Sequence, residues 1–190
     1  MKMKAAIWCR HKDDCIIGIG PNIPWHISSD FKRFKRVTKG KSIVAGQTTY
    51  ESFPNRTLPN RKIYVMTFDA DYQVSDKQNH FVVTNKSQLD VLLNEELYIS
   101  GGASIYRLFM TDIETAPDVI VDCCYQGEID ASLTGQPVDV KSCVEFMEKN
   151  YLPYTSSITE DNVDVCLWVK NNTQINETQI TDIWKRIVEK

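Results

Sequence analysis

The sequence predicts an α/β fold with a mostly parallel central sheet, helices on both of its faces and an antiparallel hairpin at one edge. Three observations predict this class. Short segments of continuous apolar character recur along the chain, amphipathic helical segments separate them, and two strand-like segments around a polar turn follow at residues 154–170. Continuous apolar strands that alternate with helices are typical of parallel sheets buried on both faces.

In the first half of the chain, the local pattern predicts each element in turn. Residues 4–9 form a short apolar strand, and the loop after it contains glycines and prolines that interrupt regular structure. The helix at 29–39 carries three apolar residues on one face and ends at Gly40. The next elements are a strand at 42–46, a helix at 47–53 that Pro54 ends, and a strand at 62–68.

The second half repeats this alternation and adds one helix. The expected elements are a strand at 81–85, a helix at 87–94 capped by Ser87, a strand at 96–102, a helix at 103–110 and a strand at 118–125. Residues 171–190 form an amphipathic extension to a domain at 1–170. Its apolar stripe has the spacing of one helix face and consists of Ile180, Ile183, Trp184, Ile187 and Val188.

This C-terminal helix has two possible roles. It either packs back onto the domain, or it docks on a second copy or another protein. We therefore expect a monomer or a weak dimer.

The composition is that of an ordinary globular protein. Of 190 residues, 42% are hydrophobic and 25% charged, which suits one domain with a substantial core. The formal net charge of −3 leaves no basic excess to neutralise phosphates, so a general nucleic-acid binder is excluded. No apolar stretch approaches the length of a membrane span or of a signal-peptide core. The six cysteines and three histidines lack metal-ligand spacing, which predicts reduced thiols, no bound metal and a cytoplasmic location.

Two strand–glycine–helix junctions are candidates for phosphate binding. Gly46 precedes one helix, and Gly101 with Gly102 precedes another. Unpaired N–H groups at helix starts favour anions, and ligands of open α/β sheets bind where the strands end. One such junction is usually only structural, but two in a short chain favour a cofactor with a pyrophosphate.

The segment IPWHISSDFKRFK places one carboxylate, Asp30, among aromatic and apolar residues. The plain explanation is helix geometry, in which Ser28 or Ser29 caps the helix and an acid in the first turn meets the helix dipole. Arg61 is likewise either a solvated charge at a turn or a clamp for a substrate carboxylate. The residues alone leave both questions open.

In their order and spacing, these motifs resemble dihydrofolate reductases. The resemblance covers residues 5–125, is general over 126–170 and has no counterpart over 171–190. It rests on A-A-I, on I-G with P-W seven residues after that glycine, on Asp five residues after the tryptophan, and on G-x-T-T-Y-E-S, L-P-N-R-K and S-G-G-A-S-I-Y. It implies transfer of a hydride from NADPH to C6 of the pterin of dihydrofolate, with a proton delivered to N5.

The resemblance also implies roles for individual residues. The catalytic residues would be Asp30, Trp25 and Ile23, with Asp30 bonded to the pterin 2-amino group and N3 in an apolar pocket that raises its pKa. The other two belong to a mobile loop over the nicotinamide, residues 18–25. The expected substrate-binding residues are Ala6, Ile7, Asp30, Phe31, Phe34, Phe53, Leu58, Arg61, Ser100 and Asp122. The expected NADPH-binding residues are Ala6, Ile17, Gly18, Ile19, Gly46, Gln47, Thr48, Thr49, Thr67, Lys86, Gly101, Gly102, Ala103, Ser104, Ile105 and Tyr106.

For three of the aromatic residues, a role in the core remains open beside the role in the pocket, because apolar helix faces are usually core. These are Phe31, Phe34 and Phe53.

Three positions depart from the family pattern. Gln47 is neutral where many relatives carry a basic residue for the adenosine 2′-phosphate, and Lys86 could substitute for that charge. Asp122 takes the place of a threonine that supports the catalytic carboxylate, unless a shift of register puts Cys123 there. Ser100 stands where an aliphatic residue commonly touches the substrate.

Two other functions remain open. A riboflavin-pathway reductase shares this fold but should lack the P-W…D-F motif and Arg61. A non-catalytic structural or assembly protein could also use the fold, although Asp30 and both glycine junctions argue against it.

Overall fold

The computed structural model of this chain describes residues 3–92, 96–154 and 158–189. The strands in these residues are β1 (Lys4–His11), β2 (Ile16–Ile19), β3 (Ser42–Gly46), β4 (Lys62–Met66), β5 (His80–Val83), β6 (Leu97–Ile99), β7 (Val119–Tyr125), β8 (Pro137–Asp139), β9 (Tyr151–Pro153), β10 (Ile158–Glu160) and β11 (Val163–Lys170). The helices are α1 (Ser28–Thr38), α2 (Gln47–Ser52), α3 (Lys86–Leu92), α4 (Ala103–Phe109), α5 (Lys141–Asn150) and α6 (Glu177–Val188), with a short 3₁₀ helix at Pro54–Arg56.

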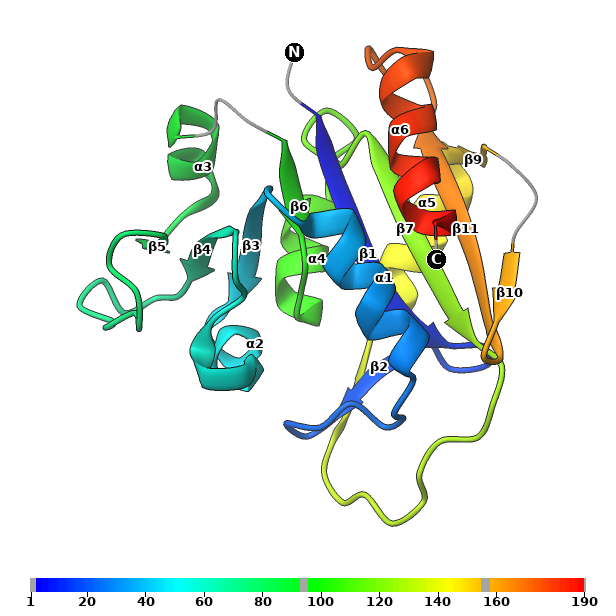
Figure 1. The fold of residues 1–190 in the computed structure, drawn as a ribbon, viewed down its shortest axis with the longest axis horizontal. Coiled ribbons are helices and arrows are strands. Elements are labelled where there is room, and N and C mark those ends of the chain that lie inside the picture. Colours follow the sequence, from blue (N-terminus) through cyan, green and yellow to red (C-terminus); the bar gives the residue numbers. More distant parts are fainter. Residues whose placement is uncertain (1–2, 93–95, 155–157, 190) are drawn as a thin grey trace.

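The central sheet is mostly parallel, as predicted. Its strands follow the order β10-β11-β7-β1-β6-β3-β4-β5, and β9 pairs with β11. All neighbours from β7 to β5 are parallel, whereas β11 is antiparallel to β7, β9 and β10. Figure 1 shows the sheet with this antiparallel edge beside β7. The predicted fold class, including the edge hairpin, is therefore confirmed.

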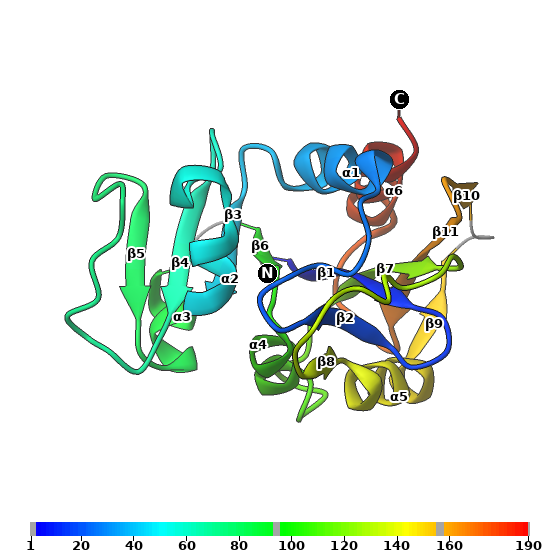
Figure 2. The same ribbon diagram turned by 90° about the horizontal axis from the view of Figure 1, so that it is seen from below.

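Helices cover both faces of the sheet. In Figure 2, α1 and α6 lie on one face and α4 and α5 on the other. The alternation of side chains along β1 divides the core accordingly. Ala5 and Ile7 join the cluster under α1 and α6, whereas Ala6 and Trp8 join the cluster over α4 and α5. Burial of these two apolar layers is the main source of stability.

Helix α6 packs onto the face of the sheet that α1 covers. Ile180, Ile183 and Ile187 are buried in the cluster that α1 also covers. The Arg36 guanidinium of α1 donates hydrogen bonds to the carbonyls of Arg186 and Ile187, at 3.2 and 3.0 Å. These carbonyls lie in the last turn of α6, where the helix itself supplies no donor. Of the two roles considered for this helix, the structure shows the packing.

Some elements differ from the sequence-based expectation. The loop after β1 contains β2, which pairs with β8 from more than a hundred residues later, and α5 and β9 were not expected either. The cap of α3 is Asn85, whose Oδ1 accepts from the Gln88 amide, rather than Ser87. The last two residues of the helix expected at 87–94 lie outside the described residues. Across the described ranges, the structure shows no helix that could span a bilayer.

Candidate active site

Asp30 lies in the first turn of α1, beside the carboxyl-terminal half of β1. Neither Ser28 nor Ser29 caps this helix, because the N-cap position is Ile27 and makes no side-chain cap bond. The Ser29 hydroxyl is buried without a hydrogen-bond partner in the described part of the chain. Serine capping is therefore not what places an acid here.

The Asp30 carboxyl group is enclosed by two thiols and a guanidinium. Cys9 and Cys123 face each other on the paired strands β1 and β7, and both side chains hydrogen-bond to Asp30. The Arg33 Nη1 lies 3.1 Å from Asp30 Oδ1. Burial raises the pKa of Asp30 because it disfavours the charged form, while the Arg33 cation and the hydrogen bonds act in the opposite direction. The side chain is still 22% exposed, so a ligand can reach it.

Several expected pocket residues lie on the face of the sheet that carries Asp30. Ile7, Trp25 and Phe34 belong to the same apolar cluster, on the face of the sheet that α1 covers. The ring of Trp25 packs against Tyr125 of β7, with centroids 5.0 Å apart. Two other expected residues, Ile23 and Phe31, expose 52% and 47% of their surface. Large apolar side chains that remain exposed are available for contact with a ligand.

The remaining aromatic and aliphatic candidates lie farther along the sheet. Phe53 and Leu58 pack against a small cluster of Tyr50, Ile63 and Val65, which gives Phe53 a role in the core. Ser100 follows β6 and points its hydroxyl toward the Tyr98 carbonyl at 3.4 Å.

Arg61 is held rigidly rather than solvated. Only 6% of its surface is exposed. Its Nε donates to Thr38 Oγ1 at 2.9 Å, Nη1 to the Pro59 carbonyl at 2.7 Å and Nη2 to the Lys35 carbonyl at 2.8 Å. A guanidinium has five N–H groups, so Nη1 and Nη2 each carry a second one. The solvated-charge explanation is therefore wrong, and the clamp for a substrate carboxylate stays a prediction.

The two glycine junctions meet because β3 and β6 are neighbours. The Gly46 amide donates to the Gly101 carbonyl at 2.7 Å. A Cβ on Gly46 would lie 3.2 Å from Ile105, and one on Gly102 would lie 3.3 Å from Thr49 Oγ1. Glycine at these two positions therefore lets the two junctions pack closely against each other. Around this point, Thr48 and Ser104 are exposed, whereas Ala103 and Tyr106 are buried.

The loop expected over the nicotinamide is tied to a distant segment. Ile17, Gly18 and Ile19 lie in β2, which pairs with β8. The Gly20 amide donates to the Gln136 carbonyl at 2.9 Å, and Gly20 has a φ of +56°, which glycine adopts without strain. In Figure 1, β2 lies below the first turn of α1.

A family model for dihydrofolate reductase matches residues 3–136 of the chain. The chain belongs to the dihydrofolate reductase family. The dihydrofolate reductase of Neisseria gonorrhoeae is 36% identical over 134 residues, which cover 66% of this chain and 77% of that protein. The one of Bacillus subtilis is 40% identical over 108 residues, which cover 52% of this chain and only 62% of that protein.

A solved structure agrees with the fold. Dihydrofolate reductase from Enterococcus faecalis, complexed with NADP(H) and RAB-propyl, superposes with a TM-score of 0.69 at 22% identity, over 90% of this chain and 97% of that one. The expected family resemblance is thus confirmed.

The structure corrects the place of Asp122 in this family member. Its carboxylate accepts from Arg10 Nε at 2.9 Å and Nη2 at 3.0 Å, and from the Trp8 indole at 2.6 Å. These partners lie on the face of the sheet opposite to Asp30, since successive residues of a strand point to opposite faces. Cys123 takes the position beside Asp30, as the shifted register required. The placement of Asp122 among the substrate-binding residues is therefore wrong.

At the expected adenosine end of the nucleotide site, Gln47 and Lys86 contact other residues of the chain. The Thr67 hydroxyl donates to Gln47 Oε1 at 2.7 Å, and Gln47 Nε2 donates to Glu51. Lys86 Nζ lies 3.4 Å from the Leu108 carbonyl and 4.9 Å from the centre of the Phe109 ring. Both contacts are in the last turn of α4, whereas Gly102 lies at its first turn. These contacts do not test the predicted role of Lys86 at the adenosine 2′-phosphate, which stays a prediction.

Sequence reasoning missed Arg33, Cys9 and Glu160 as neighbours of the acid. The Arg33 Nη2 lies 3.1 Å from Glu160 Oε2 on β10. One signal was available for Arg33, because residues three apart on a helix share a face and Arg33 follows Asp30 by three. No local signal could identify Glu160, which is 127 residues from Arg33 in the sequence.

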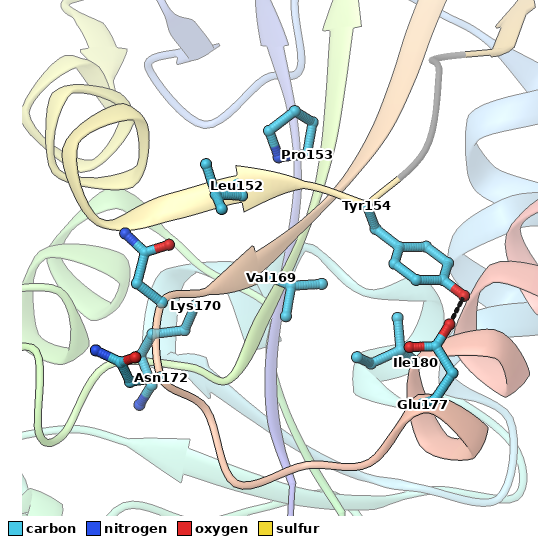
Figure 3. A pocket seen from close by; sticks show the side chains of 9 residues that line it. Leu152, Pro153, Tyr154, Val169, Lys170, Asn172, Glu177 and Ile180 are labelled. Carbon is cyan, nitrogen blue, oxygen red and sulfur yellow. Dashed lines mark hydrogen bonds between the residues drawn. The ribbon is translucent and has the colours of Figure 1, made fainter.

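A separate hollow lies at the other end of the molecule. It has a volume of about 690 Å³ and is bounded by β9, the end of β11 and the start of α6. Figure 3 shows Tyr154 and Glu177 joined by a hydrogen bond along one wall, with Ile180 beside them. Lys170 lines the same hollow, and its backbone amide donates to the Asp118 carbonyl. The Asp118 amide donates in turn to the carbonyl of Lys4, at the start of β1. This hollow therefore borders the amino-terminal edge of the parallel strands, away from Asp30.

Proposed function

We propose that this chain catalyses the NADPH-dependent reduction of 7,8-dihydrofolate to 5,6,7,8-tetrahydrofolate. The observation that carries the proposal is the placement of the Asp30 carboxyl group near the paired glycine junctions. Asp30 lies beside β1, β6 pairs with β1, and β3 pairs with β6. Strands are spaced about 4.8 Å apart, so β1 and β3 lie about 10 Å from each other across the sheet. That separation suits a nicotinamide and a pterin placed face to face.

NADPH fits the glycine junctions. The Gly46 amide is bonded to the Gly101 carbonyl, so the N–H groups at the starts of α2 and α4 would bind the pyrophosphate. The cofactor supplies the hydride, and the chain supplies position and electrostatics. We infer that Thr49 and Ile105 border the cofactor at this point, and that Ile23 and Trp25 close the loop over the nicotinamide.

Asp30 would hold the pterin and help to protonate it. A carboxylate offers about four lone-pair positions, which here face Arg33 and the thiols of Cys9 and Cys123. Because a thiol is a weak donor, a ring amino group and a ring N–H would take the place of the thiol contacts. Since burial raises the pKa of Asp30, its protonated fraction persists to higher pH than for an exposed aspartate. Turnover should therefore fall as the pH rises through the pKa of Asp30. The fork of Arg61 would bind the α-carboxylate at the other end of the substrate.

The same residues favour this reaction over the alternatives. A positioned Arg61 and a half-buried Asp30 have no use in a riboflavin-pathway reductase or in an assembly protein. We further propose that the chain acts as a monomer, because the apolar stripe of α6 is buried against its own domain. The six cysteines are free thiols in the structure, which suits a reducing compartment such as the cytoplasm.

The test is the loss of NADPH absorbance with dihydrofolate, for the wild type and for Asp30→Asn. Asp71→Asn, which alters an exposed carboxylate in a loop, is the matched control. We expect turnover in the wild type and the control, and a fall of about a hundredfold or more in Asp30→Asn, the usual range for loss of acid–base assistance. A wild type that binds NADPH but does not turn over dihydrofolate would refute the proposal.

A further inference from the structure

Arg33 is a fully buried cation inside the candidate active site. Its side chain has no exposed surface, and it lies on the inner side of α1, one turn after Asp30. Its Nη1 and Nη2 lie 3.1 Å from Asp30 Oδ1 and 3.1 Å from Glu160 Oε2. Removing a guanidinium from water is costly unless anions balance it. The two carboxylates flank this cation on both sides and supply that balance.

Glu160 reaches Arg33 because of the edge hairpin. It ends β10, and the turn to β11 consists of Asp161 and Asn162, with φ values of 52° and 60°. Two such residues in succession form the tight turn that suits the twist of a hairpin. The turn therefore holds Glu160 over α1. Its side chain is still 41% exposed, so solvent partly screens its charge.

The other ionisable groups around Asp30 are neutral at ordinary pH. Burial raises the pKa of the Cys9 and Cys123 thiols, and also that of Tyr106 behind β1, well above neutrality. In the described part of the chain, the charges that face Asp30 are thus Arg33 directly and Glu160 through Arg33.

We propose that Arg33 and Glu160 are positioning residues that set the protonation of Asp30 in opposite directions. The Arg33 cation stabilises the ionised carboxylate and fixes its orientation. Glu160 competes for the same guanidinium and so weakens this effect. This inference rests on the proposed reduction of dihydrofolate by the same site.

The contact geometry sets the size of the effect. An opposite charge within about 4–6 Å lowers the pKa of a carboxyl group by roughly 1–3 units. Arg33 makes a single contact to Asp30 rather than a bidentate one, which places the effect near the lower end. Arg33→Met should therefore raise the apparent pKa by about one unit, a tenfold change in the protonated fraction above the pKa. Glu160→Gln should lower it by less, because Glu160 acts through Arg33 and is partly exposed.

The experiment measures the pH dependence of turnover between about pH 5 and pH 9, where a raised carboxyl pKa is observable. The variants are Arg33→Met, Arg33→Lys and Glu160→Gln, and Glu148→Gln on α5 is the control for loss of one acid. Arg33→Lys keeps the charge and should restore most of the wild-type profile. In parallel, ¹³C-labelled aspartate reports the Asp30 carboxyl titration directly, assigned by its absence in Asp30→Asn.

Opposite shifts in the Arg33→Met and Glu160→Gln variants support the proposal, since a merely structural role would move both profiles in one direction or neither. Shifts of the two pH profiles in the same direction, or no shift in either variant, overturn the proposal. If Arg33→Met does not fold, as thermal melting shows, Arg33→Lys and Glu160→Gln decide the question. If the wild type does not reduce dihydrofolate, the proposed function fails, but the carboxyl titration still tests Arg33 and Glu160.

Discussion

Replacing Ile183 by alanine should destabilise the whole protein, because α6 is part of the core. Ile183 has no exposed surface and lies among residues of β7, β11 and α1. Removing a fully buried isoleucine side chain to Cβ costs about 2–5 kcal/mol, from lost transfer free energy and from the cavity. We take about 3 kcal/mol as the expected loss. For a chain of this size each kcal/mol lowers Tm by about 2–4 °C, so Tm should fall by about 6–12 °C.

The assay is urea unfolding with and without this substitution, followed by intrinsic fluorescence. The midpoint should fall while the slope with denaturant stays unchanged, since the slope reports the surface exposed on unfolding. Val188→Ala, at a position that is 37% exposed on the same helix, is the matched control and should cost less than about 1 kcal/mol. Unchanged stability of Ile183→Ala, together with a change from dimer to monomer in light scattering, would refute the packing of α6 as a source of stability.

Three further substitutions test the site. Gly102→Ala should weaken NADPH binding measured by fluorescence, because its Cβ would lie 3.3 Å from Thr49 Oγ1 where the cofactor is expected; unchanged affinity would argue against this junction. Arg61→Lys loses the planar fork and should raise the KM for dihydrofolate more than it lowers kcat, whereas equal KM values would contradict the carboxylate clamp. Asp122→Asn leaves Arg10 buried without a counter-charge and should cost about 3 kcal/mol in urea unfolding, while the pH profile of turnover stays in place. A moved profile would instead place Asp122 in the site.

The sequence alone determined the features that depend on local spacing. Continuous apolar strands and the i, i+3 pattern of the helix at Ser28–Thr38 identified the class and most of its elements. The glycine junctions at Gly46 and Gly101 were visible because glycine after a strand marks a close approach of backbone. Asp30 was a candidate because it is a single carboxylate in a segment of aromatic and apolar residues.

Only the tertiary structure decided which partners these features meet. A one-residue change of register moves a strand side chain to the other face of the sheet, so the choice between Asp122 and Cys123 needed the pairing of β1 with β7. Glu160, the second partner of Arg33, and β8, the partner of β2, come from segments more than a hundred residues away. Local propensity does not predict such contacts, because burial and charge balance select them when the whole sheet is assembled.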